Sequence, residues 1–318
     1  MIDAELDRLA KRYGKDREDV KRLLAGAAHS DAGAKIAKSV LRAAIRRAGE
    51  DPDDHDPFSI VSGAYDLGGD GVRIGALPDG QEFIWRHDEI PYSAMCVGAP
   101  GFGKTTAAIS WIMQLAKWYT IIIPDLRGDY EALCRLVPGA RLFAFGEFPI
   151  NLMRGSSRVP PATFAARFVE VFTDQFELFQ ASRRYLNMIW DTLDAKRAAS
   201  GHWPCLLDLK DALEKRKENR GSSELEFRNR CLARVDAICR ALGDAAIGVE
   251  QGIDLESLIE QKSLIIFRLE LERSIQDFLV HWLVMYVFEH RVFAEDKFNQ
   301  KPLIFVLDEQ RSILQERR

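Results

Sequence analysis

Short apolar runs alternate along the chain with segments of helical periodicity. Five of the runs have strand length: residues 92–97, 118–124, 141–145, 263–267 and 303–307. Apolar residues at helical spacing occupy residues 107–117 and 274–292 between them. Runs that are apolar throughout are typical of strands buried on both faces, and their alternation with helices predicts an α/β fold built on a parallel sheet.

The segment from 154 to 261 interrupts this alternation. Apolar residues recur there at helical spacing with charged residues between them, and no strand-like run appears. We therefore predict an all-helical insertion into the sheet domain. Its aromatic stripe consists of Phe164, Phe168, Phe172 and Phe176. We interpret this stripe as helix core rather than as a platform on which nucleic-acid bases stack.

The part of the chain before the first strand divides into three segments. Residues 1–50 predict a helical N-terminal arm, with a basic stripe formed by Lys35, Lys38, Arg42 and Arg46. A DNA- or partner-binding face and an ordinary solvated face both fit this stripe, and we favour the solvated face. The acidic, proline-bounded residues 50–57 mark a domain boundary. Residues 58–92, rich in turn signals, predict a small β-ribbon that leads into the sheet domain.

Composition narrows the functional classes. The chain has 318 residues, of which 47% are hydrophobic, and its formal net charge is −4, so DNA contact would need local patches or the channel of an assembly. The five cysteines are odd in number and show no C-x-x-C spacing, which argues against a disulfide framework or a zinc site. We see no signal peptide and no membrane-spanning run, and expect a cytoplasmic protein that only a partner would bring to the inner membrane.

The stretch from Gly98 to Thr105 fits the phosphate-loop pattern G-x-x-x-x-G-K-[ST]. Its glycines permit a tight turn that points backbone N–H groups at an anion, and the predicted helix after it contributes its positive N-terminal end. Lys104 would contact the β- and γ-phosphates of ATP, and the Thr105 hydroxyl would bind Mg²⁺. The predicted nucleotide-binding residues are Gly98, Ala99, Pro100, Gly101, Phe102, Gly103, Lys104, Thr105 and Thr106.

Two acidic residues, Asp308 and Glu309, follow the last apolar run. Asp308 is placed to bind Mg²⁺ beside the phosphate loop, and Glu309 to polarise the water that attacks the γ-phosphate. Lys104 and Glu309 are therefore the predicted catalytic residues. Asp125, at the end of another run, either helps to hold water or metal or, with Asp129, shapes a turn, and the sequence leaves both possibilities open.

Four segments in a fixed order resemble the HerA/FtsK superfamily of DNA-pumping ATPases, in the branch of HerA, the conjugative coupling proteins and the type IV secretion ATPases. These segments are residues 98–106, 123–130, 150–152 and 305–310. The resemblance implies a RecA-like P-loop NTPase domain, formed by residues 93–153 and 262–318. It also implies a homo-oligomeric ring, a hexamer, through which ATP hydrolysis draws DNA. On this basis Lys104 and Thr105 bind nucleotide and Mg²⁺, Asp308 assists the metal and Glu309 is the catalytic base.

The sequence also departs from that family. Coupling proteins begin with membrane helices and HerA with a β-barrel, and neither is visible here. Further strands, a polar sensor residue and an arginine finger normally follow the segment around Glu309, so we expect the C-terminal part of the domain to be missing or supplied by another polypeptide. The leading hypothesis is an ATP-hydrolysing DNA translocase. The alternatives are a type IV secretion or conjugation ATPase that moves protein or protein–DNA substrates, and a nucleotide-gated scaffold that recruits a nuclease or another effector.

Overall fold

The computed structural model describes residues 4–13, 18–27, 31–47, 70–76, 82–88, 90, 94–99, 101–219, 221–296 and 302–308. The chain divides into two compact units. The smaller comprises Met1–Leu67 and Leu77–Gln81, and the larger comprises Gly68–Ala76 and Glu82–Arg318. Within the described residues, no helix is both long and apolar enough to cross a bilayer.

The smaller unit contains three helices in its described part: α1 (Ala4–Tyr13), α2 (Glu18–Ala27) and α3 (Asp31–Arg47). They pack through a small apolar core of Leu6, Leu9, Ala10, Val20, Ala37, Leu41 and Ile45. The basic stripe on α3 is not simply solvated, because Lys38 and Arg42 each donate to a Glu5 carboxylate oxygen at 2.7 Å. These hydrogen bonds, that of Lys38 first, lower the pKa of Glu5. Half of the stripe therefore joins α3 to α1.

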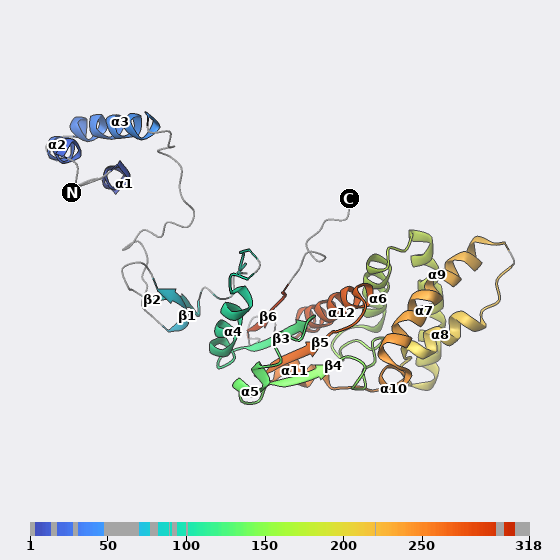
Figure 1. Cartoon of the computed structure of the whole chain (residues 1–318). Helices are drawn as coiled ribbons and strands as arrows, with labels where there is room; N and C mark the ends of the chain where they lie inside the picture. Colours follow the sequence, from blue (N-terminus) through green and yellow to red (C-terminus); the bar gives the residue numbers. More distant parts are fainter. Residues whose placement is uncertain are drawn as a thin grey trace. The chain divides into compact units, whose positions relative to one another are not determined.

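The larger unit is built on a four-stranded sheet in the order β4-β5-β3-β6, and every neighbouring pair is parallel (Figure 1). The strands are β3 (Thr120–Asp125), β4 (Arg141–Ala144), β5 (Leu264–Arg268) and β6 (Leu303–Phe305). All six residues of β3 are buried. A separate antiparallel ribbon, β1 (Gly71–Ala76) with β2 (Glu82–Arg86), packs on the sheet domain through Val72. The unit therefore has the α/β architecture that the alternating pattern predicts.

Alternate residues of the central strands face two different apolar cores. Ile121 and Ile123 of β3 point toward α4 (Lys104–Leu115) and α5 (Leu133–Leu136). Ile122 points the opposite way, toward α12 (Arg273–Val292) and the helices before it. Side chains on a strand alternate between the two faces, so the continuous apolar run of β3 serves both cores. The sheet is the middle of three layers.

Residues 154–261, between β4 and β5, contain no strand in their described part. Their helices are α6 (Pro161–Gln175), α7 (Gln180–Ser200), α8 (Leu206–Lys215), α9 (Ser223–Leu242), α10 (Asp244–Ile247) and α11 (Leu255–Glu260). The aromatic stripe of α6 is buried, and Phe168 and Phe172 pack edge-on against Phe278 of α12. The stripe is core, as its helical spacing indicates.

The strand predicted over residues 92–97 is wrong in its described part. Residues 94–99 form no strand, and the side chains of Met95 and Val97 are 77% and 69% exposed. An apolar run becomes a strand only where another strand offers its backbone groups. The outer strands β4 and β6 each have one side without a strand partner in the described sheet, but residues 94–99 pair with neither.

Candidate functional site

The phosphate loop turns through two glycines with positive φ, Gly101 at 83° and Gly103 at 78°. Only glycine adopts this left-handed conformation without a steric penalty. A Cβ atom added to either residue would meet no described atom within 4 Å, and both residues are exposed, so the loop is open to solvent at these two positions. Gly98, Ala99, Phe102 and Thr106 are exposed as well, and Pro100 lies outside the described residues.

Helix α4 begins directly after the loop, with Gly103 as its N-cap residue. Among the described residues no side chain caps this end, and the first turn holds no acidic residue. The first backbone N–H groups of a helix have no partner within the helix, and together they favour a negative charge. The loop and the start of α4 therefore fit a phosphate group, which would supply the missing acceptors.

Lys104 lies over its own loop. Its Nζ donates to the carbonyl oxygens of Gly98 at 3.0 Å and Ala99 at 3.1 Å. These two bonds hold the ammonium group against the backbone of the loop. The position of the lysine therefore agrees with a phosphate-binding role.

The last described residue of the chain, Asp308, reaches the loop from β6. Thr105 Oγ1 donates to Asp308 Oδ2 at 3.5 Å, which joins residues that are 203 positions apart. Tyr130 donates its hydroxyl hydrogen to the same oxygen at 2.9 Å. Carboxylate and hydroxyl oxygens are the ligands that Mg²⁺ prefers in proteins, so Thr105 and Asp308 fit the cation that accompanies a nucleotide.

Tyr130 is the member of this group that the sequence analysis did not single out. Its burial above all, and then the nearby Asp308 carboxylate, raise the pKa of the phenol above its ordinary value. The hydroxyl therefore keeps its proton and acts as the donor. The sequence signal was present, since Tyr130 follows directly after Asp125-Leu126-Arg127-Gly128-Asp129 at the end of a buried strand.

Asp125 shapes the turn that carries Tyr130. Its side chain is buried, and Oδ1 accepts the backbone N–H groups of residues 127, 128 and 129 at 3.2, 2.9 and 3.2 Å. Oδ2 accepts the N–H of Tyr130 at 2.9 Å. Four amide donors engage both carboxylate oxygens. Of the two possibilities that the sequence left open, the structure shows the turn-forming one.

Glu309, the predicted catalytic base, and Gln310 lie outside the described residues. Among the described residues, no group of three or more His, Cys, Asp or Glu side chains is arranged to hold a metal ion. The described site thus consists of the open loop, Lys104, Thr105, Asp308 and Tyr130.

Comparisons with known proteins show similarity among solved structures only. No protein-family model matches the chain, and no curated protein matches it. Among solved structures it is similar to that of VirB4 of Thermoanaerobacter pseudethanolicus, with 15% sequence identity and a TM-score of 0.48. The match covers 70% of this chain and 65% of that chain, so the chain spans less than two thirds of its VirB4 counterpart. At this TM-score the similarity assigns no family, and what the site does rests on its own geometry.

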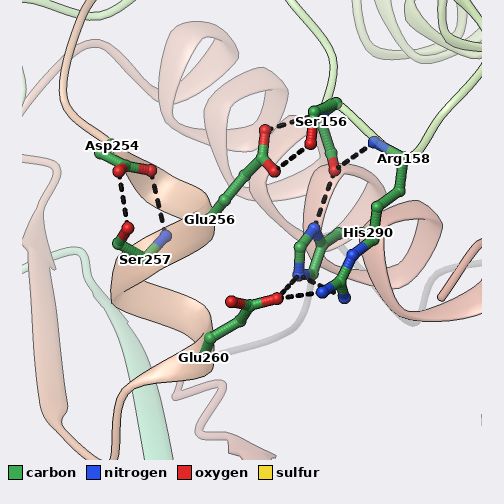
Figure 2. A network of polar contacts seen from close by, with 8 residues as sticks. Ser156, Arg158, Asp254, Glu256, Ser257, Glu260 and His290 are labelled. Carbon is green, nitrogen blue, oxygen red and sulfur yellow. Dashed lines mark hydrogen bonds and ion pairs between the residues drawn. The ribbon is translucent and has the colours of Figure 1, made fainter. Parts of the chain in front are cut away.

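A second polar cluster, which we call the His290 cluster, comprises Ser156, Ser157, Arg158, Glu256, Glu260 and His290 (Figure 2). His290 Nδ1 lies 2.8 Å from Ser156 Oγ, and its Nε2 lies 3.2 Å from Arg158 Nη1 and 3.6 Å from Glu260. Arg158 also pairs with Glu260. Ser157 donates its backbone N–H and its hydroxyl to Glu256 at 2.7 and 2.6 Å.

The His290 cluster contains a serine, a histidine and a carboxylate, the residue types of a hydrolytic triad. However, Ser156 is only 3% exposed, and its Oγ also accepts the backbone N–H of Arg158 at 3.3 Å. A nucleophile that substrate cannot reach performs no chemistry. The cluster instead has a structural role. It links the segment that precedes α6 with helix α11 and with the C-terminal end of helix α12.

Proposed function

We propose that this chain contains the nucleotide-binding core of a P-loop ATPase. One observation carries the proposal: the hydroxyl of Thr105, in the first turn of α4, contacts the carboxylate of Asp308, three residues after β6, and Lys104 bonds to the loop before α4. A phosphate-binding loop and an acidic strand end in contact form the arrangement that holds a nucleotide triphosphate with its Mg²⁺. This arrangement also supports a RecA-like form of the α/β fold.

Each residue then has a task set by its chemistry. Bound ATP and Mg²⁺ would supply the phosphoanhydride bond and the divalent charge. Lys104 neutralises phosphate charge, and the loop and α4 N–H groups orient the phosphate oxygens. Thr105 and Asp308 hold the cation, Asp308 through water or directly. Glu309, which directly follows Asp308 in the sequence, would accept a proton from the attacking water.

We further propose that hydrolysis drives a motor, and we take DNA moved through a hexameric ring as the first candidate. The motivation is the resemblance of residues 98–106, 123–130 and 305–310 to the HerA/FtsK superfamily. A type IV secretion or conjugation ATPase that moves protein or protein–DNA substrates is the alternative. The similarity to VirB4 agrees with this alternative rather than with the first candidate. Measuring how ATP hydrolysis responds to DNA decides between the two.

The test measures ATP hydrolysis by the full chain, with and without duplex and single-stranded DNA. We expect Mg²⁺-dependent turnover and its loss by a factor of about 10² or more in Lys104→Ala, because the substitution removes a charge that acts on the transition state. The matched control is Lys117→Ala, an exposed lysine beyond the other end of α4, which should hydrolyse ATP like the wild type.

The possible results separate the hypotheses. Hydrolysis that DNA stimulates supports a DNA translocase. Hydrolysis that responds only to a secretion partner supports the alternative. Stable ATP binding without sustained turnover supports a nucleotide-gated scaffold, and a pull-down of effectors with residues 1–50 deleted would then test the N-terminal arm as the docking element. Absence of ATP binding, or hydrolysis that Lys104→Ala leaves unchanged, would contradict the proposed function itself.

A further inference from the structure

Tyr130 brings a polar atom from the interior of the sheet domain to the candidate site. Its side chain is 2% exposed, and its hydroxyl donates to Asp308 Oδ2 at 2.9 Å. A buried phenol loses its hydrogen bonds to water, so a partner within the protein is required to offset that loss. Asp308 provides it, although a phenylalanine would fill the same space without needing one. The hydroxyl therefore calls for an explanation beyond packing.

The position of this hydroxyl is tightly determined. The ring of Tyr130 packs in the apolar core shared with Ile112, Ile123 and Leu133. Its backbone N–H is held by Asp125 Oδ2 at 2.9 Å. The ring and the backbone are thus fixed from two sides, and a rigid phenol can hold its hydroxyl group at one point in space.

Asp308 lies where the chain leaves the sheet. The strand β6 has three residues, and the ladder continues with the N–H of Val306, which donates to Ile122 at 2.9 Å. Asp308 is two residues further on and only partly buried. The end of a short strand orients a side chain less firmly than its middle, so hydrogen bonds to the carboxylate matter more here.

Thr105 and Tyr130 both donate to Oδ2 of Asp308, from different elements. We infer that Tyr130 is a positioning residue, whose hydroxyl holds the Asp308 carboxylate in the orientation that faces Thr105. The inference rests on the proposed function and deepens it: Tyr130 sets the divalent-cation affinity of the site without touching the cation. Groups that hydrogen-bond a metal-binding carboxylate have this effect elsewhere in proteins.

The test compares the full chain with its Tyr130→Phe variant, which removes one oxygen and keeps the ring. The readout is Mn²⁺ binding in the presence of ADP, followed by the electron paramagnetic resonance signal of free Mn²⁺, together with the Mg²⁺ concentration that half-saturates ATP hydrolysis. We expect Mn²⁺ affinity to fall by about 10-fold or more, the range observed when a partner of a metal ligand is removed. The Mg²⁺ requirement for hydrolysis should rise by a similar factor.

Tyr119→Phe is the matched control. Tyr119 is also a buried tyrosine of the same core, but its hydroxyl pairs with His87 Nδ1 at 2.7 Å, not with Asp308. This variant should keep the wild-type Mn²⁺ affinity. In an Asp308→Ala background, the Tyr130→Phe change should have no further effect on Mn²⁺ binding, because the carboxylate that it positions is gone.

The outcomes are distinguishable from failure of the proposed function. A wild-type chain that binds no Mn²⁺–ADP and hydrolyses no ATP overturns the proposed function. A wild-type chain that does both, with a Tyr130→Phe variant of unchanged Mn²⁺ affinity, overturns the role of Tyr130 alone. That role is likewise overturned if thermal unfolding shows that Tyr130→Phe destabilises the chain more than Tyr119→Phe while Mn²⁺ affinity is retained.

A second variant keeps the inference testable if Tyr130→Phe does not fold. Asp308→Asn keeps the shape of the side chain but not its charge, so its Mn²⁺ binding tests the carboxylate that Tyr130 is inferred to position. We expect a loss of Mn²⁺ affinity in this variant. Unchanged Mn²⁺ affinity there also overturns the inference.

Discussion

The larger unit contains two polar clusters that are built in opposite ways. At the phosphate loop the glycines are exposed and the start of α4 has no side-chain cap, and within the described residues Lys104 bonds only to carbonyl oxygens of its own loop. In the His290 cluster the central serine and histidine are buried and paired with each other, and every ring nitrogen of His290 has a neighbour. The first arrangement leaves bonding capacity for a ligand, whereas the second uses it within the protein.

The comparison shows that residue type alone does not identify a site. Where serine and histidine are buried away from substrate, as in the His290 cluster, their contacts with each other and with glutamate stabilise the fold. Glycine, lysine and threonine form a candidate site where, among the residues that the structure describes, the start of α4 has no side-chain cap. The four predictions that follow test this distinction, and they run from the largest expected effect to the smallest.

Asp125 holds the backbone of Tyr130, which contacts the candidate site, but its own carboxylate is buried and fully used within the protein. We therefore expect it to affect stability. Removal of its carboxylate in Asp125→Ala leaves four backbone N–H groups without their acceptor. We expect the free energy of unfolding to fall by about 3 kcal/mol, since the buried N–H of Tyr130 and three partly buried N–H groups lose a charged acceptor. Chemical denaturation measures it, with the exposed Asp129→Ala in the same turn as control. An Asp125→Asn variant of unchanged stability but altered Mg²⁺ dependence would instead indicate a metal-binding role.

His290→Ala should also destabilise the chain. It removes one of the two partners of Ser156 Oγ and one partner of Arg158, and leaves a space where the insertion meets α12. The expected loss is about 2–3 kcal/mol, measured by chemical denaturation, with nucleotide affinity unchanged. His281→Ala on the same helix, where the ring is only partly buried, is the control and should cost less. If His290→Ala instead slows ATP turnover at full stability, the cluster has a function beyond structure.

Gly103→Ala should affect both stability and binding. Its φ of 78° is unfavourable for alanine, and we expect a loss of about 1 kcal/mol in stability. Gly139, with a φ of 81° and equally open space around its Cβ position, gives a matched control remote from the loop. Both variants should lose similar stability in thermal unfolding, but only Gly103→Ala should weaken nucleotide binding in a titration. Equal nucleotide affinity in the two variants would argue against the loop as the binding site.

The pH dependence of stability gives the smallest expected effect. Burial, followed by the charge of Arg158, lowers the pKa of His290 below its ordinary value of 6.5, although Glu256 and Glu260 partly oppose this. As pH falls below about 6.5, the unfolded chain binds a proton on this residue before the folded chain does, so stability decreases. His290→Gln should flatten this part of the pH profile in denaturation experiments. A wild-type stability that rises as the pH falls from about 7 to about 5, and that His290→Gln flattens, would contradict this assignment.

The sequence predicted correctly those strands and helices whose hydrophobic pattern lies within a short segment of the chain. The apolar runs at 118–124, 141–145 and 263–267 correspond to β3, β4 and β5, and the helical spacing of residues 154–261 corresponds to α6 to α11. The run at 92–97 failed as a strand prediction because an apolar pattern does not reveal whether the segment will pair with another strand, and residues 94–99 pair with none. The role of Asp125 stayed open for a similar reason, since the sequence does not show which donors a carboxylate will meet.

The sequence by itself determined the turn at Gly101 and Gly103 and the helix that follows it, because glycine conformation and the start of a helix depend on residues that are neighbours in the chain. Only the tertiary structure decided that Asp308 meets Thr105, that Tyr130 donates to the same carboxylate, and that Ser156 and His290 are enclosed. These contacts join residues far apart in the chain: Thr105 and Asp308 are 203 positions apart, and Ser156 and His290 are 134 positions apart. They exist because the parallel sheet and the return of the chain through α11 and α12 bring distant segments to one place, which no local pattern encodes.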